Sequence, residues 1–326
     1  MASPNLLAPP SSITPATALA LSQKAPPILS THPTSTLPWP LSLLFTSESP
    51  ETWTIHENLF YASLRTGDDK SARLILDRLS SRFSPANERI LTLRGIYEEA
   101  LAKTPAELEK VFANYENVLR DEPTNFSIRK RRIAVLKSLG RREEAVTALT
   151  VLLENSPTDA EAWAELGDLY AQGGCWAQAV FCLEEVLLIT PNAWGAHAQI
   201  ATLHYLTTPS TVSTLALALR HFARSVELNE SYLRGWYGLK LVSKKLIPML
   251  AEVGRGGNKR GNREDEDEDA PPPKLETVKK LEELATGKLA EIVRMYGAGK
   301  KGWTGFDEAE VIAARELLDR DGKIER

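Results

Sequence analysis

Residues 160–193 read AEAWAELGDLYAQGGCWAQAVFCLEEVLLITPNA, and this stretch decides the fold. Apolar side chains recur at helical spacing in its first half and again in its second half, on either side of Gly174. This pattern predicts two amphipathic helices joined by a tight turn. We expect the following residues to pack the two helices together and to close the hairpin: Trp163, Leu166, Gly167, Tyr170, Ala179, Leu183 and Pro191.

Proline recurs at a fixed distance through the middle of the chain. Pro123, Pro157 and Pro191 follow one another at intervals of 34 residues, and each comes after an apolar helical run. That interval is the tetratricopeptide period. Proline suits this place because the first turn of the next helix needs no N–H donor. We therefore expect an all-α fold, a tetratricopeptide-like right-handed superhelix of antiparallel helical hairpins.

Glycine and alanine also recur in pairs along the repeat array. Three glycines each precede an alanine by five residues, in the pairs Gly67 and Ala72, Gly140 and Ala145, Gly174 and Ala179. Glycine can adopt the positive φ that ends the first helix of a hairpin, and alanine lets the second helix approach closely. The predicted packing set therefore includes Ala145 and Pro157 of the preceding hairpin.

Composition divides the chain into four parts. Half of the twenty prolines lie within residues 1–50, which predicts a disordered arm rich in Pro, Ser and Thr. Residues 51–250 carry the repeat array, which we expect Pro248 to close. Residues 254–273 include six consecutive acids, which predicts a charged disordered linker. Residues 274–326 have the apolar spacing of C-terminal amphipathic helices.

Charge and hydropathy argue against nucleic-acid binding and against a membrane-spanning protein. A net charge of -4 and a pI near 5.9 argue against nucleic acid, because nucleic-acid-binding domains are usually strongly basic. We expect no transmembrane span, because the apolar stretches fall far short of the roughly 20 residues that cross a bilayer. Membrane association would therefore be peripheral.

The two cysteines indicate a reducing compartment. Cys175 and Cys182 lie on one predicted helix, and a separation of seven residues places their backbones about 10 Å apart. That distance exceeds the reach of a disulfide. We expect both thiols to be packing residues of a cytoplasmic protein.

We expect neither catalysis nor a bound cofactor or metal. The histidines stand at no recognised zinc-ligand spacing, and the HExxH, nucleophile-elbow, Walker and dinucleotide-binding motifs are missing from the sequence. An enzyme with an unrecognised site is the alternative. Its only support is the abundance of carboxylates, which solubility explains equally well.

Candidate partner-binding residues lie in a basic cluster and at two tryptophans. A basic cluster of this kind is more often a solvated helix face, and its functional interpretation is a site for an acidic partner segment or anionic lipid headgroups. Nucleic acid is a weaker choice because no aromatic residues interleave with the charges. Exposed tryptophans can anchor an interface. The candidates are Lys130, Arg131, Arg132, Arg141, Arg142, Trp194 and Trp236.

Several short runs resemble one family more closely than they resemble tetratricopeptide proteins in general. They are AWAELGDLY at 162–170, AVFCLEEVLL at 179–188, WTIHE at 53–57, DEPTN at 121–125, RKRR at 129–132 and RGWYGL at 234–239. Together they resemble subunit 2 of the ER membrane protein complex, over roughly residues 53–246.

The resemblance implies a scaffold rather than an enzyme. In this family the repeat array holds other subunits of the complex, both membrane-spanning and soluble, at the cytosolic face of the endoplasmic reticulum membrane. It thereby supports the insertion of transmembrane segments. Nothing in the resemblance assigns a role to the proline-rich arm or the acidic linker.

A free adaptor for chaperones, or for another cytosolic assembly, is the alternative binding function. Adaptors of that type hold a C-terminal carboxylate with a lysine and asparagines on first helices. Lys130 stands at the lysine position, but Ala134 occupies the place where asparagine is expected. This departure counts against a chaperone clamp.

Overall fold

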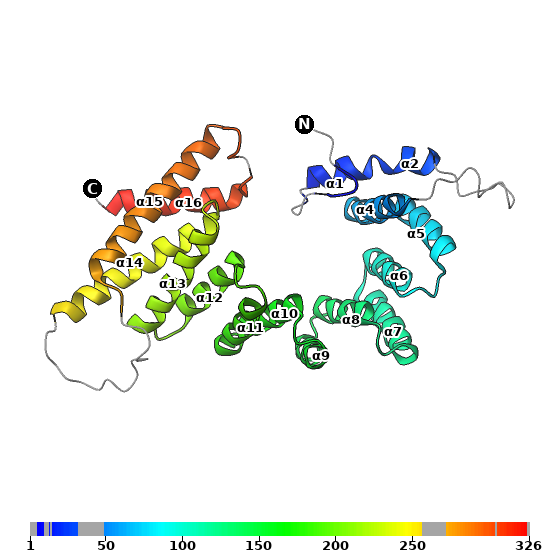
Figure 1. The fold of residues 1–326 in the computed structure, drawn as a ribbon, viewed down its shortest axis with the longest axis horizontal. Helices are drawn as coiled ribbons and strands as arrows, with labels where there is room; N and C mark the ends of the chain where they lie inside the picture. The colour runs from blue at the N-terminus through cyan, green and yellow to red at the C-terminus, as the bar shows by residue number, and fades with distance from the viewer. Residues whose placement is uncertain are drawn as a thin grey trace. The chain divides into compact units, whose positions relative to one another are not determined.

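A computed structural model describes residues 5–9, 13, 15–31, 49–255, 272–303 and 305–324 (Figure 1). The regular elements within these residues are all helices, and most of the helices from α4 onwards pack against the next helix along the chain. The tetratricopeptide-like, all-α fold is thereby confirmed. The helices are α1 (Pro15–Ser22), α2 (Ala25–Thr31), α4 (Pro50–Thr66), α5 (Asp69–Phe83), α6 (Glu88–Leu101), α7 (Pro105–Asp121), α8 (Phe126–Ser138), α9 (Arg142–Asn155), α10 (Ala160–Gln172), α11 (Trp176–Ile189), α12 (Trp194–Leu206), α13 (Val212–Leu228), α14 (Leu233–Arg255), α15 (Leu275–Gly297) and α16 (Glu308–Ile324).

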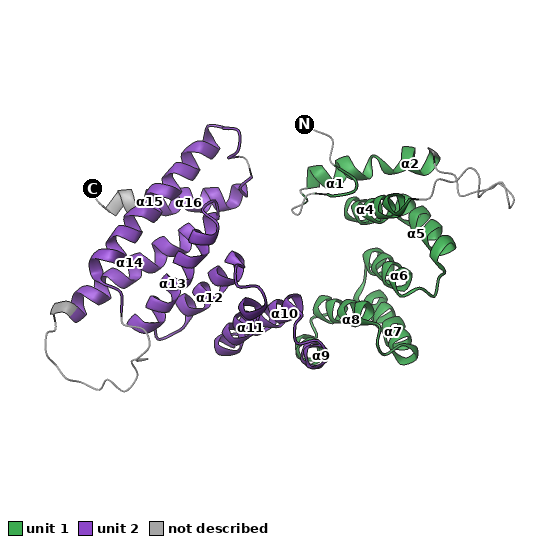
Figure 2. Cartoon of the chain, in the orientation of Figure 1, with its two compact units in different colours: residues 1–148 green, residues 149–326 purple. Residues whose placement is uncertain are grey.

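The chain forms two compact units, residues 1–148 and residues 149–326 (Figure 2). We call them the N-terminal unit and the C-terminal unit. The predicted array of residues 51–250 is therefore divided between the two. The C-terminal unit also includes the last two helices, which the sequence could not assign to a docking place.

The hairpin turns have the backbone that the spacing predicts. Gly67, Gly140 and Gly174 have φ angles of 74°, 75° and 76°. An L-residue with a side chain rarely adopts this conformation, so glycine is favoured at each turn. The alanines five residues later are Ala72, Ala145 and Ala179, and each is completely buried.

Close helix packing is clearest between α10 and α11. A Cβ on Gly167 would lie 3.3 Å from Cys182 Cβ and 3.5 Å from the Ala179 carbonyl oxygen. A side chain at position 167 would make a tight contact with Cys182, so glycine eases the close approach of the two backbones. The buried Leu166 and Leu183 lie beside this contact.

The remaining packing candidates lie at the edge of the same hairpin. Trp163 is half-buried, and its Nε1–H donates to the Pro157 carbonyl at 2.8 Å. Its ring meets Phe181 edge to face, with centroids 6.0 Å apart. Tyr170 is half-buried on α10, and Pro191 is exposed in the turn after α11. These contacts tie the turn before α10 to the hairpin.

Helix α7 begins where the sequence places a capping box. Thr104 accepts a hydrogen bond from the Glu107 N–H, and the Glu107 side chain accepts one from the Thr104 N–H. Pro105 occupies the first helical position, where it has no N–H to leave unbonded. Local side chains therefore fix this helix start.

Residues 15–31 of the expected N-terminal arm form the helices α1 and α2, which corrects the prediction of disorder for this part of the arm. Leu21 of α1 and Ala25 and Leu29 of α2 are buried, and α1 and α2 pack on α4 and α5. Pro26 and Pro27 fall in the first turn of α2, where proline removes no helical hydrogen bond. The arm residues 32–48 lie outside the described residues.

Helix α14 continues through Pro248, so this proline does not end the helix as expected. A proline inside a helix costs about 3 kcal/mol. Packing offsets the cost, since Met249 and Leu250 contact the core shared by α12 to α16. Most of the predicted linker, residues 256–271, lies outside the described residues.

The last two helices fold back onto α14. Val278, Ala285 and Leu289 of α15 are completely buried in that shared core. Lys240 of α14 is buried as well, and its Nζ lies 2.8 Å from Glu282 Oε1 of α15. The C-terminal helices therefore cover the apolar face of α14.

Candidate partner-binding groove

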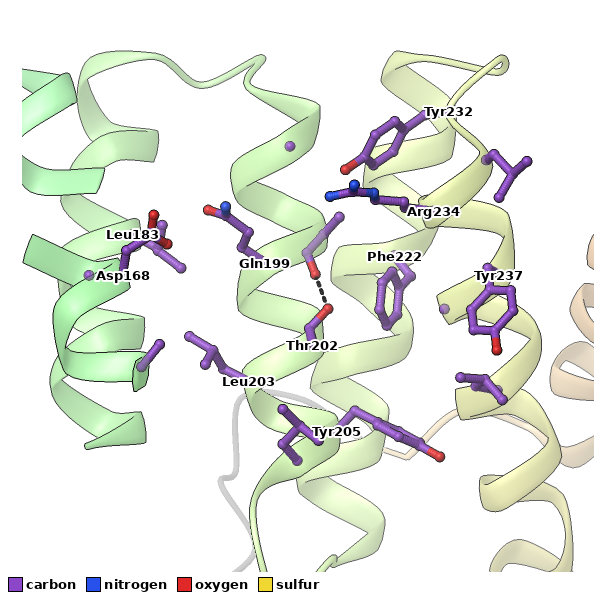
Figure 3. Close-up of a pocket in the computed structure, with 18 of the residues that line it drawn as sticks. Asp168, Leu183, Gln199, Thr202, Leu203, Tyr205, Phe222, Tyr232, Arg234 and Tyr237 are labelled. Atoms are coloured by element: carbon purple, nitrogen blue, oxygen red, sulfur yellow. Dashed lines mark hydrogen bonds between the residues drawn. The ribbon is translucent and has the colours of Figure 1, made fainter. Parts of the chain in front are cut away.

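A groove of about 870 Å³ opens on the C-terminal unit (Figure 3). Its walls come from α10, α11, α12, α13, α14 and α16. Apolar and aromatic side chains make up most of the lining, and they are Ala171, Trp176, Leu183, Ala198, Leu203, Tyr205, Leu206, Phe222, Tyr232, Leu233, Tyr237, Leu241 and Ala313. The volume falls in the range of about 300–1,000 Å³ typical of ligand sites.

Small residues on α12 leave room for the groove. Gly195, Ala198 and Thr202 follow one another at spacings of three and four along that helix, and all three line the groove. Residues at such spacings share one helix face. This stripe is visible in the sequence, where it could have identified the wall.

Glycine also brings α13 and α14 together behind the groove. A Cβ on Gly238 would lie only 2.2 Å from the ring of Phe222. The ring can therefore lie against the α14 backbone, and both residues line the groove. A larger residue at position 238 would displace this part of the wall.

The polar groups are few and lie around the apolar lining. Asp168 and Gln199 line the groove from α10 and α12. Arg234 Nε lies 2.6 Å from Glu310 Oε1 of α16, which compensates that positive charge. Thr202 Oγ1 donates to the Ala198 carbonyl at 2.7 Å within its own helix. A few polar groups around an apolar floor are typical of a ligand-binding cleft.

The predicted basic cluster is largely engaged inside the N-terminal unit. Arg131 Nε donates to Glu99 Oε1 at 3.0 Å, and Tyr115 donates to the same carboxylate. Burial and the Glu99 charge raise the pKa of Tyr115. Arg132 pairs with Glu116. These arginines therefore join α8 to α6 and α7.

Arg141 belongs to the same network. It pairs with Glu144 at 2.5 Å and Glu109 at 3.3 Å, and its guanidinium lies 4.8 Å from the centre of the Phe112 ring. Arg132 lies over the same ring at 5.5 Å. The structure thus brings the two arginines together around an aromatic residue, with acids beside them.

The other candidates differ in exposure. Lys130 is half-buried, with its Nζ 5.3 Å from the centre of the Phe126 ring. Arg142 is exposed at the start of α9. Trp194, the first residue of α12, is 45% exposed but does not line the groove.

Trp236 is a packing residue, which corrects its selection as an interface anchor. It is only 5% exposed, and its Nε1–H donates to the Glu230 carbonyl at 2.7 Å. Trp163 makes the equivalent bond to the residue six positions earlier. Both tryptophans stand three residues after the start of their helix, and this shared position is the sequence signal for the hydrogen bond to the preceding turn.

Three histidines cluster on α12 and α13. His197 Nδ1 and His221 Nδ1 are 3.0 Å apart, and the rings of His204 and His221 have centroids 6.2 Å apart. Burial, together with the other two histidines, lowers the pKa of His221 to about 4. Burial lowers the pKa of His197 and His204 as well. Within the described residues, no group of three or more His, Cys, Asp or Glu side chains could hold a metal ion.

Comparison with known proteins supports the family suggested by the short runs. Residues 84–221 match the family model described as EMC2 TPR-like repeat domain. The TPR repeat protein oca3 of Schizosaccharomyces pombe is 32% identical over 199 residues, which cover 61% of this chain and 69% of that protein. ER membrane protein complex subunit 2-A of Xenopus laevis is 35% identical over 191 residues, which cover 59% of this chain and 62% of that protein.

The chain belongs to the ER membrane protein complex subunit 2 family.

Another relative from this family, ER membrane protein complex subunit 2 of Saccharomyces cerevisiae, is 29% identical over 205 residues, which cover 58% of this chain and 68% of that protein. The chain spans less than two thirds of the Xenopus laevis member. The match to the family model includes α10 to α12 of the groove, whereas α14 and α16 lie beyond it. None of the helices that the structure describes is both long and apolar enough to span a bilayer.

Proposed function

We propose that this chain is a non-catalytic scaffold subunit of the ER membrane protein complex. It acts as a peripheral protein at the cytosolic face of the endoplasmic reticulum membrane and supports the insertion of transmembrane segments. Its partners are other subunits of that complex, both membrane-spanning and soluble. The observation that carries this proposal is an open apolar groove on the tetratricopeptide-like helices of a subunit 2 family member.

The groove supports binding rather than chemistry. The lining of the groove is mostly apolar. Two of its charged side chains, Arg234 and Glu310, neutralise each other in an ion pair. Binding to such a surface is favoured mainly because it removes apolar area from water. We therefore assign the groove a role in assembly.

Exposed candidates outside the groove supply a second set of contacts in this proposal. Arg142 and Trp194 are exposed, and Lys130 is half-buried on α8. Arg131 and Arg132 mainly hold the N-terminal unit together through Glu99 and Glu116. An interface that used these two arginines would have to compete with those ion pairs.

Two observations disfavour the chaperone adaptor. Ala134 lacks the amide that a carboxylate clamp requires, and Asp168 places a negative charge on the groove wall. An acidic chaperone C-terminus would be repelled there.

Affinity purification tests the proposed function. The tagged full chain is recovered from detergent-solubilised membranes of its own organism, and the bound proteins are identified by mass spectrometry. We expect integral membrane proteins of the endoplasmic reticulum and soluble subunits to be recovered together. Recovery of chaperones without integral membrane proteins would favour the adaptor and overturn the proposal.

A further inference from the structure

The connection between α15 and α16 differs in charge from the repeat helices of the C-terminal unit. Residues 292–306 read IVRMYGAGKKGWTGF and contain three basic side chains, Arg294, Lys300 and Lys301, but no acid. Residues 149–219, by contrast, contain seven acids and no lysine or arginine. A local excess of positive charge attracts anions. The end of this unit therefore has a different class of partner from its repeat helices.

The three basic side chains of this connection are available to a partner. All three are exposed, and none of them forms an ion pair with another residue that the structure describes. The basic cluster of the N-terminal unit differs in this respect, because carboxylates hold Arg131 and Arg132. The first acid after the connection is Asp307, and its carboxylate accepts a hydrogen bond from the Ala309 N–H at 2.8 Å. That charge is therefore directed to the start of α16.

Two glycines shape the backbone of the connection. Gly299 follows α15 with a φ of 63°, in the left-handed region that glycine adopts without strain. The next four residues form a tight turn, which is closed by a hydrogen bond from the Trp303 N–H to the Lys300 carbonyl at 3.0 Å. Lys301 and Gly302 are its central residues, and Gly302 has a φ of 93°, as a type II turn requires. The turn therefore presents both lysines at the end of the α15–α16 hairpin (Figure 1).

Aromatic side chains attach this turn to the C-terminal unit. Trp303 and Phe306 are half-buried and pack against the core shared by α12 to α16, with their ring centroids 6.4 Å apart. The backbone of the turn is therefore held in place while the lysines remain in water. Neither lysine lines the large groove or the two smaller pockets at α5 to α6 and at α9 to α11. An exposed turn of this kind suits an extended anionic surface better than a small enclosed anion.

We propose that the turn at Lys300 and Lys301 contacts the anionic headgroups of a membrane surface. The lysine ammonium is a compact, strongly hydrated charge, which suits a layer of headgroups better than a bidentate pocket. Each lysine close to such a surface strengthens binding about fivefold. Two lysines make a weak contact, which orients the C-terminal unit but does not anchor the chain by itself. The inference rests on the proposed place at the endoplasmic reticulum membrane and names the residues that face its lipids.

Co-sedimentation of the purified full chain with lipid vesicles tests this contact. Vesicles of phosphatidylcholine alone are compared with vesicles that also contain about 30% phosphatidylserine, at low ionic strength because salt screens such contacts. We expect the chain to bind the phosphatidylserine vesicles at least about tenfold more strongly than the phosphatidylcholine vesicles. Equal binding to the two kinds of vesicle would overturn the inference.

Matched lysine pairs test whether the turn itself makes the contact. Lys279 and Lys280 are also adjacent and exposed, but a glutamate lies three residues before this pair and another lies three residues after it on α15. We expect Lys300→Glu with Lys301→Glu to weaken binding to phosphatidylserine vesicles at least about tenfold, and Lys279→Glu with Lys280→Glu to weaken it less than about threefold. All four side chains are exposed, so equal melting temperatures should show that both variants fold. Equal losses would assign the binding to net charge and contradict the role of the turn.

Other anionic partners are tested with the same proteins. A polyglutamate peptide and a single-stranded RNA take the place of the vesicles at the same ionic strength. We expect neither to bind wild type more strongly than the variant with Lys300→Glu and Lys301→Glu, because two lysines without a surrounding pocket give a soluble anion little to hold it. Binding of either one through these lysines, without binding to phosphatidylserine vesicles, would overturn the inference.

Affinity purification from detergent-solubilised membranes separates this inference from the proposed function. Detergent removes the bilayer, so we expect the variant with Lys300→Glu and Lys301→Glu to recover the same proteins as wild type while its vesicle binding is lost. Vesicle binding equal to that of wild type would overturn the inference and leave the proposed function standing. Absence of integral membrane proteins from the wild-type sample would overturn the proposed function, and the vesicles would still decide whether the turn binds lipid.

Discussion

Tryptophan has different roles in this chain according to its position in a helix. Trp163 and Trp236 lie three residues inside α10 and α14, and each ring nitrogen donates to a backbone carbonyl in the preceding turn. Trp194 is the first residue of α12 and is exposed. A shift of three residues along the helix therefore separates a residue that anchors a turn from one available to a partner.

Ala179 tests the importance of close packing between α10 and α11. We expect Ala179→Leu to lower the free energy of unfolding by about 1–3 kcal/mol, because Ala179 is completely buried among Leu183 and Ile200 and the larger side chain would overpack that cluster. Ala177→Leu is the matched control, since Ala177 is exposed on the same helix, and it should change stability by less than about 0.5 kcal/mol. Urea unfolding followed by circular dichroism measures both. Equal midpoints for wild type and Ala179→Leu would contradict the packing argument.

The histidine cluster predicts a dependence of stability on pH. The folded state lowers the pKa of His221 to about 4, whereas an unfolded histidine titrates near pH 6.5. The unfolded chain therefore binds more protons between these values. This contribution to stability is complete above about pH 6.5 and decreases as the pH falls towards about 4.

Comparison of wild type with a His221 variant separates the contribution of this histidine from that of the carboxylates, which titrate in a similar pH range. Urea midpoints are measured at several pH values for wild type and His221→Gln. We expect the variant to lose less stability than wild type on acidification from neutral pH, because the buried imidazole is gone. Identical pH slopes would show that the cluster contributes nothing. The lowered pKa values of His197 and His204 act in the same direction.

Helices α15 and α16 show how an element gains its place from packing. An isolated amphipathic helix is marginal in water, and burial of its apolar face supplies most of its stability. On α15 that face includes Val278, Ala285 and Leu289, which are packed into the core shared with α14. The buried Lys240–Glu282 pair lies in the same contact.

A pair of leucines on α15 tests this docking. Leu289 is completely buried, and Leu284 on the same helix is exposed. We expect Leu289→Ala to destabilise the C-terminal unit by about 2–5 kcal/mol, and Leu284→Ala to cost less than about 0.5 kcal/mol. Chemical unfolding of the full chain measures the difference. Similar small losses in both variants would mean that α15 does not rest on α14 in solution.

At the scale of the whole molecule, stability should follow the order of the helices. In a repeat array each hairpin contacts mainly its neighbours, so a local loss of packing weakens nearby hairpins most. The core that joins α12 to α16 is built from side chains of those helices, and a separate cluster joins α2, α4, α5 and α6. The two units therefore have cores of their own.

Hydrogen exchange measured by mass spectrometry tests this arrangement. We expect Leu289→Ala to accelerate amide exchange most in α14 to α16, less in α12 and α13, and least in α4 to α7. Leu79→Ala, which removes a buried side chain of α5, should give the opposite gradient. Uniform acceleration along the chain would show that the whole molecule opens as one cooperative unit.

The sequence by itself determined the helical hairpins of the repeat array, their turns and the capping of α7. Each of these depends on residues close in the chain, such as Gly174 with Ala179 or Thr104 with Glu107. Local spacing shows which face of a helix is apolar and where the helix can start or stop.

Only the tertiary structure decided what covers each face. Arg131 pairs with Glu99, which lies 32 residues earlier, and Lys240 pairs with Glu282, 42 residues later. The same long-range packing turned an expected disordered arm into α1 and α2, carried α14 past Pro248 and buried Trp236. A periodic pattern specifies that a face must be buried, but the partner that buries it is selected by shape and charge across distant segments.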